Sequence, residues 1–169
     1  MAKSRSVVDA TIKVPAESRN KYAYDRRKKV LRLERVLDPT ISFPANYGFV
    51  EETSQASEEP ADILIWTQSP LVPSCSLRAR VFGAMRIVDG DGVDTKLLAV
   101  ADKDPAFEDI ADLADFDKER LAVAETFFRE YKKLGGKAVT KVEFVDRTVA
   151  DDYIATALRA YWENVRSET

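Results

Sequence analysis

FPANYGF, residues 43–49, is the segment around which the rest of the chain is organised. Pro44 fixes its own φ angle and biases the residue before it towards an extended conformation, so this half of the segment is rigid. Asn46 and Gly48 tolerate turn conformations that most residues avoid, which predicts a corner between two strands. Tyr47 lies between them with a hydroxyl group available for binding. The local pattern fits both a structural corner and a binding segment.

The composition limits the chemistry that the chain can perform. It has 169 residues, one cysteine and no histidine. The length predicts a single domain, residues 1–169, because domains run to about 100–200 residues. One cysteine excludes an internal disulfide, and the lack of histidine excludes Ser-His-Asp and Cys-His catalysis and His-ligated zinc. Catalysis would have to use carboxylates, lysine, arginine, tyrosine and hard metal ions.

The charge and hydropathy patterns narrow the partners and the location. The net charge is −3, although 33% of the residues are charged. This balance gives no electrostatic basis for binding nucleic acid. No apolar run reaches the roughly 20 residues of a membrane span. We therefore expect a cytoplasmic protein that binds neither nucleic acid nor membranes.

Apolar and β-branched runs predict a body made mainly of strands. The expected strands cover residues 7–15, 21–25, 30–37, 62–66, 76–88 with a bend near Gly83, 97–101 and 137–145. Residues 89–96, rich in aspartate and glycine, predict a hairpin turn. Arg35 shares a strand face with three leucines, so it must be paired or reach a cleft.

Two helices are expected in the last third of the chain. Residues 117–134 carry apolar side chains at helical spacing and end at two glycines. A second helix follows Thr148, which we expect to be its N-cap, with Asp151 in the capping-box position. No internal repeat or linker interrupts the chain. The pattern predicts an α+β, mainly β fold: a twisted antiparallel β-barrel with two packed helices.

Several segments, in this order and spacing, resemble the soluble family I inorganic pyrophosphatases over residues 7–165. They are Ser18-Arg19-Asn20-Lys21-Tyr22, Arg35-Val36-Leu37, residues 43–49, Pro60-Ala61-Asp62, Asp89 with Asp94-Thr95-Lys96, and Phe127-Phe128-Arg129-Glu130-Tyr131-Lys132-Lys133. The resemblance implies an OB-like barrel and Mg²⁺-dependent hydrolysis of diphosphate. Such a site needs carboxylates for metal ions and cations for phosphate.

The resemblance also assigns residues to these two tasks. The implied phosphate-binding residues are Lys21, Arg35, Tyr47, Lys96, Tyr131 and Lys132. The implied metal ligands are Asp62, Asp89 and Asp94, for Mg²⁺ or alternatively Mn²⁺. Glu59 would be the catalytic base, acting with Asp62, Tyr47 and Arg35.

Several acids of the family pattern are replaced. The family motif Asp-Gly-Asp-Pro-X-Asp reads Ser57-Glu58-Glu59-Pro60-Ala61-Asp62 here. Ser57 stands at a metal-ligand position, and Glu59 stands where a shorter aspartate handles the attacking water. Ala23 and Lys13 occupy positions where the family has glutamate. The site should hold fewer divalent ions, and Lys13 would supply a fixed positive charge near phosphate.

Three functions remain open at this stage. The first is hydrolysis of diphosphate, an organic diphosphate or a phosphoester with a reduced metal site. The second is binding of a phosphorylated ligand or a protein partner without catalysis. The third is a different, biosynthetic reaction that uses the cations to hold a phosphate handle.

The resemblance further implies a homo-oligomer. Many bacterial family members carry histidines on the Phe-Phe helix at subunit contacts. Thr126 and Glu130 occupy those positions here. This departure weighs against the family hexamer.

Overall fold

The computed structural model describes residues 5–169. The strands are β1 (Ser6–Val14), β2 (Asn20–Asp25), β3 (Val30–Val36), β4 (Asn46–Val50), β5 (Asp62–Trp66), β6 (Ser76–Asp89), β7 (Gly92–Ala101) and β8 (Lys141–Asp146). The helices are α1 (Lys118–Leu134) and α2 (Arg147–Ser167), with short 3₁₀ turns at Pro105–Phe107 and Leu113–Asp115. The expected content of strands and two long helices is confirmed.

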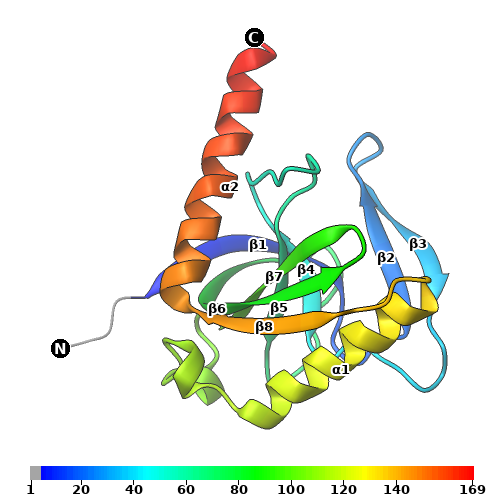
Figure 1. Ribbon diagram of the computed structural model, residues 1–169. Coiled ribbons are helices and arrows are strands. Elements are labelled where there is room, and N and C mark those ends of the chain that lie inside the picture. Colours follow the sequence, from blue (N-terminus) through cyan, green and yellow to red (C-terminus); the bar gives the residue numbers. More distant parts are fainter. Residues whose placement is uncertain (1–4) are drawn as a thin grey trace.

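The main sheet closes into a ring (Figure 1). Its strand order is β1-β4-β5-β7-β6-β8, and a further pairing between β1 and β6 closes the barrel. The first half of β6 pairs with β1 and its second half pairs with β8. A register shift between Val81 and Gly83 marks the change of partner, which confirms the expected bend.

One strand pair departs from the expected antiparallel pattern. β5 and β7 run parallel, with Asp62 opposite Lys96 and Trp66 opposite Val100. The other pairings of the main sheet are antiparallel among residues 5–169. The parallel pair places the first residue of β5 beside a lysine that lies far away in sequence.

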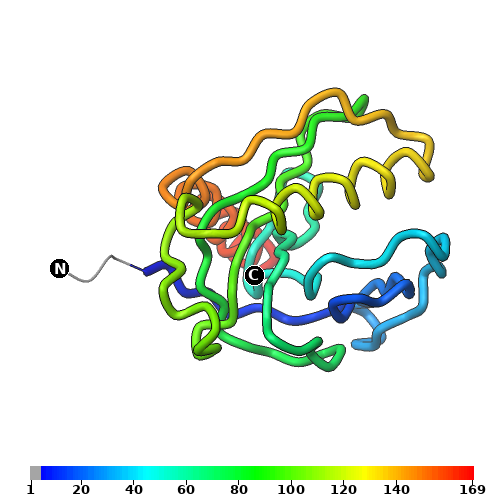
Figure 2. Tube along the Cα trace, turned by 90° about the horizontal axis from the view of Figure 1, so that it is seen from below, coloured from blue at the N-terminus to red at the C-terminus, as the bar shows by residue number. Residues whose placement is uncertain are grey.

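Alternate residues of the strands feed two apolar clusters. One cluster packs against α1 through Leu121, Ala124, Phe127 and Phe128. The other packs against the start of α2 through Ala150 and Ile154. Figures 1 and 2 show α1 running alongside the barrel, and Figure 1 shows the C-terminal part of α2 projecting away from it.

The β2–β3 hairpin forms a separate two-stranded sheet beside the barrel (Figure 1). Residues 26–29 form its turn, between the two strands expected at residues 21–25 and 30–37. A register shift between Lys21 and Tyr22 interrupts the pairing near the base of the hairpin. Residues of the hairpin also line the cavity described in the next subsection.

The prediction of turn conformations at Asn46 and Gly48 is wrong, because both lie within strand β4. Gly48 is required for another reason. A Cβ atom there would lie 2.0 Å from the carbonyl oxygen of Thr11 on β1. The glycine therefore permits close approach of two strands.

Asn46 is a fully buried polar residue that ties two loops to the barrel. Its Oδ1 accepts hydrogen bonds from the backbone N–H groups of Ala16 at 3.1 Å and Leu71 at 2.9 Å. Its Nδ2 donates to the carbonyl oxygen of Ile65 and to the hydroxyl of Thr67, both at 2.8 Å. All of these bonds lie in or near the core, where unpaired groups are costly.

Asn46→Ala is expected to lower the free energy of unfolding by about 2–3 kcal/mol, because buried donors and an acceptor lose their partners. Urea denaturation followed by far-UV circular dichroism measures the loss. Asn164→Ala is the matched control, since Asn164 is exposed and its side chain donates only a 3.5 Å hydrogen bond to Ser54 within residues 5–169. Equal losses in the two variants would contradict the role assigned to Asn46.

The expected start of the last helix also needs correction. Asp146, and not Thr148, is the N-cap of α2, and its carboxylate accepts from the N–H of Val149 at 3.1 Å. Strand β8 runs directly into the helix, so the cap falls on the last strand residue. The carboxylate of Asp151 instead accepts a hydrogen bond from the hydroxyl of Ser6.

Candidate active site

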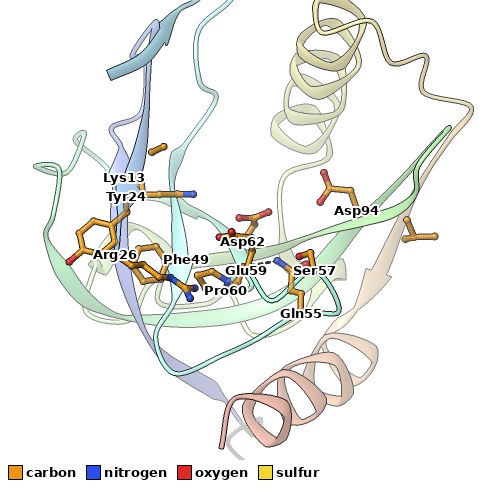
Figure 3. A pocket seen from close by; sticks show the side chains of 12 residues that line it. Lys13, Tyr24, Arg26, Phe49, Gln55, Ser57, Glu59, Pro60, Asp62 and Asp94 are labelled. Atoms are coloured by element: carbon orange, nitrogen blue, oxygen red, sulfur yellow. Dashed lines mark hydrogen bonds between the residues drawn. The ribbon is translucent and has the colours of Figure 1, made fainter. Parts of the chain in front are cut away.

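A cavity of about 520 Å³ opens between the β2–β3 hairpin, the loop of residues 51–61 and the end of the parallel strand pair (Figure 3). Three of the predicted site residues line it: Glu59, Asp62 and Asp94. Ser57 and Lys13 line it as well. The positions at which the sequence departs from the family pattern therefore face the same space as the retained acids.

Tyr47, Asp62 and Lys96 form a hydrogen-bonded group beside this cavity. The Lys96 ammonium donates to the Tyr47 hydroxyl at 3.1 Å and to the Asp62 carboxylate at 2.8 Å. Burial opposes the charge of Lys96, but Tyr47 and the two nearby carboxylates raise its pKa well above the usual value. Burial likewise raises the pKa of Tyr47, so its hydroxyl stays protonated. Tyr47 and Lys96 can both donate to an anion.

A second lysine extends this chain of charges. Lys132 of α1 contacts Asp89 at 2.7 Å and Asp94 at 3.0 Å, and Lys96 contacts Asp94 at 3.3 Å. Burial would raise the pKa of Asp94, but the two lysines lower it overall. The hydrogen bond from Lys132 lowers the pKa of Asp89. Each of the three aspartates is therefore paired with at least one of the two lysines.

The remaining predicted phosphate ligands gather around one aromatic ring. The Arg35 guanidinium lies 4.6 Å and the Lys21 ammonium 5.5 Å from the centre of the Tyr131 ring. Lys21 also pairs with Glu34 at 2.7 Å. The Nε of Arg35 is buried and has no hydrogen-bond partner among residues 5–169. An unpaired buried donor of this kind is suited to an anionic oxygen.

The predicted site residues thus form two groups. Glu59, Asp62 and Asp94 line the cavity, with Tyr47 and Lys96 in contact with them. The second group is Lys21, Arg35 and Tyr131, which do not line this cavity. Lys132 is linked to the first group through its contact with Asp94, and Asp89 is linked to it through Lys132. The phenylalanine of the opening segment, Phe43, stacks on Tyr47 and also contacts Tyr131, which joins the two groups.

The loop that carries Ser57 and Glu59 is held by helix α2. The Tyr153 hydroxyl donates to the side-chain oxygen of Gln55 at 2.9 Å, and Gln55 donates to the carbonyl of Pro60 at 2.6 Å. The N–H of Ser54 donates to the carbonyl of Ala157 at 3.0 Å. Burial raises the pKa of Tyr153 to about 12, so its hydroxyl keeps this proton at neutral pH.

The carboxylates do not fit a metal site as they lie. Residues 5–169 contain no cluster of three or more histidine, cysteine, aspartate or glutamate side chains close enough to hold a metal ion. Lys96 bridges Asp62 and Asp94, and Lys132 bridges Asp94 and Asp89. Ammonium groups therefore lie against the carboxylates that a divalent ion would need as ligands.

The family model described as inorganic pyrophosphatase matches residues 10–162. The chain belongs to the inorganic pyrophosphatase family. It is 36% identical over 161 residues to the inorganic pyrophosphatase of Halalkalibacterium halodurans, covering 95% of this chain and 99% of that one. This confirms the family that the sequence motifs indicated.

Solved structures of pyrophosphatases confirm the fold. The inorganic pyrophosphatase of Thermus thermophilus superposes with a TM-score of 0.88 at 32% identity, covering 95% of this chain and 94% of that one. The Helicobacter pylori inorganic pyrophosphatase gives a TM-score of 0.86 at 30% identity, covering 96% of this chain and 99% of that one.

None of the helices within residues 5–169 has the length and hydropathy needed to cross a membrane.

Some residues of this pyrophosphatase-family cavity were not predicted as site residues. Arg26, Tyr24, Phe49 and Gln55 all line it. Arg26 belongs to a basic turn, a pattern more typical of a solvated surface. The sequence signal for Arg26 was its position shortly after the motif that contains Lys21. Strand β2 follows from that motif and brings its own end to the cavity.

Proposed function

We propose that this chain binds diphosphate in the cavity and hydrolyses its phosphoanhydride bond. The observation that carries the proposal is the Lys96–Tyr47 pair, which presents two protonated donors beside Glu59 and Asp62. These donors would hold phosphate oxygens, together with Lys132 from α1. Membership of the inorganic pyrophosphatase family supports diphosphate as the substrate.

The proposed reaction is attack of water on one phosphorus atom. The water oxygen forms a bond to that phosphorus while the bridging P–O bond breaks. Glu59 accepts the proton of the water, and the second phosphate leaves with the bridging oxygen. Glu59 has a longer side chain than the aspartate of the family pattern, so its carboxylate is displaced from that position by roughly one ångström. Such a misplacement can cost about 100-fold in rate.

The same proposal includes a lower requirement for Mg²⁺ than the family pattern implies. Its support is the pairing of Asp62, Asp89 and Asp94 with two lysines, which offsets part of their negative charge. Ser57, Ala23 and Lys13 provide no carboxylate at three further family positions. Binding of a phosphorylated ligand without turnover is a second candidate function, which these same ion pairs favour.

Phosphate release from diphosphate in Mg²⁺, Mn²⁺ or EDTA tests the proposal. We expect release in Mg²⁺ at less than about 1 s⁻¹, below the range of about 1–10³ s⁻¹ that is typical of enzymes. Tyr47→Phe should reduce this rate by about tenfold, since it removes one donor. No release in any metal, with diphosphate binding retained in calorimetry, would favour the silent binder. No binding at all would contradict both functions.

A further inference from the structure

Lys13 is a cation inside the cavity that has no carboxylate partner. Figure 3 shows its side chain directed into the cavity from β1. Its ammonium lies 4.8 Å from the centre of the Tyr47 ring. Within residues 5–169, no acid lies within ion-pairing distance of it, whereas Lys21, Lys96 and Lys132 are each paired. Among the described residues, no carboxylate therefore competes with a ligand for the Lys13 ammonium.

Arg26 is a second cation that lines the same cavity without an ion pair in the described part of the chain. It lies directly after β2, at the start of the hairpin turn. The neighbouring Asp25 does not neutralise it. One oxygen of the Asp25 carboxylate accepts hydrogen bonds from the N–H groups of Arg27 and Lys28, each at 3.0 Å. The turn thus fixes the acid in place and leaves the guanidinium of Arg26 unpaired.

Lys13 and Arg26 lie on the same side of Glu59 and Asp62 in Figure 3. Lys96 reaches the cavity from β7 and contacts Asp62 and Asp94. Lys13 and Arg26 reach it from β1 and from the end of β2. Ser57 also lines the cavity with a neutral hydroxyl, and in Figure 3 it lies on the Asp94 side of Glu59 and Asp62. Positive charge therefore enters the cavity from two sides, which suits a ligand with two anionic groups.

An anion in this position would offset the free-energy cost of burying the charged Lys13 side chain. Burial lowers the pKa of Lys13, and the attraction of Asp62 does not compensate for it. A phosphate oxygen beside the ammonium would stabilise the charged form. Guanidinium groups bind phosphate with two parallel hydrogen bonds, so Arg26 adds a geometrically defined contact.

We propose that Lys13 and Arg26 form a metal-independent phosphoryl subsite. The subsite holds one phosphoryl group of diphosphate while Lys96 and Tyr47 hold the other. It rests on the proposed function in that the cavity must accept diphosphate. The subsite adds that fixed cations offset the negative charge at this end of the ligand, so that diphosphate binding persists without divalent ions.

Isothermal titration calorimetry with inorganic diphosphate in EDTA tests the subsite. We expect the native chain to bind, and we expect Lys13→Met and Arg26→Met each to raise the Kd by at least about tenfold, the effect of losing one charge-assisted contact. Lys28→Met is the matched control. It removes a charge from the same turn but not from the cavity lining, so the Kd should stay within about twofold. Lys13→Arg should retain most of the affinity.

The outcomes separate the subsite from the proposed function. Binding and turnover in Mg²⁺ with no binding in EDTA would overturn the subsite and leave the hydrolytic function standing. A loss in Lys28→Met equal to that in Arg26→Met would also overturn it, since a general field and not a contact would then be responsible. Absence of diphosphate binding under every condition would overturn both. Thermal unfolding of each variant establishes that it is folded in these titrations.

Discussion

The variant Lys13→Glu, Ala23→Glu, Ser57→Asp, Glu59→Asp is expected to release phosphate from diphosphate in Mg²⁺ at least about 100-fold faster than the native chain. All four positions line the same cavity, so the new carboxylates would face the retained Asp62. Three of the changes add oxygen ligands, which Mg²⁺ prefers. The fourth shortens the proposed base and returns it to the position that the family pattern implies. Steady-state phosphate release measures the gain.

The contribution of the base can be separated by a matched pair of single variants. Glu59→Asp and Glu58→Asp remove the same methylene from neighbouring residues, but only Glu59 lines the cavity. We expect the rate to rise in Glu59→Asp and to stay unchanged in Glu58→Asp. The fourfold variant should also lose diphosphate binding in EDTA, because Lys13 is gone. No gain in the fourfold variant would place the obstacle to catalysis outside these ligands.

Arg80→Met is expected to lower the free energy of unfolding by about 3–5 kcal/mol, the cost of breaking a buried charged network. Arg80 on β6 is 0% exposed. Its guanidinium donates to the carbonyl oxygens of Asp102 at 3.0 Å, Ile110 at 2.8 Å and Phe107. It also contacts the Asp102 carboxylate at 3.0 Å. Methionine has a similar length but donates to none of these acceptors.

The control for this prediction lies on the same strand. The side chain of Arg86 is 39% exposed and is 4.0 Å from Glu143, so Arg86→Met should change the stability by less than about 0.5 kcal/mol. Chemical denaturation of both variants gives the comparison. Hydrogen exchange should further show faster exchange within residues 102–111 in Arg80→Met. Similar stability of the two variants would mean that the buried arginine does not hold this connection in place.

Much of the fold could be predicted from local patterns. The apolar run of β5 and the helix of residues 117–134, with Asp117 as N-cap, follow the expected bounds. The errors arose where distant residues decide the local structure. Gly48 lies in a strand because β1 approaches it closely, and α2 starts early because β8 leads straight into it. Neither neighbour is visible in a short window of sequence.

The site was predicted less completely than the fold. The family resemblance located the acids and cations, and the structure brings Tyr47, Asp62 and Lys96 into contact. The family resemblance did not indicate that lysines would pair with the aspartates, because these contacts join elements that are far apart in sequence. Arg26 was missed for a related reason: its relevance depends on how the hairpin packs beside the barrel.

The parallel pairing of β5 and β7 has a consequence for how this sequence can change over evolutionary time. Asp62 and Lys96 face each other across a strand ladder, so substitutions that shift either backbone also disrupt the barrel. Ser57 and Glu59 lie on a loop outside that ladder and can be exchanged without breaking it. Substitutions are therefore tolerated more easily at the acidic loop positions than at Lys96 on the strand. In a lineage no longer selected for hydrolysis, we expect the loop acids to be replaced first and the phosphate-binding lysine to be retained longest.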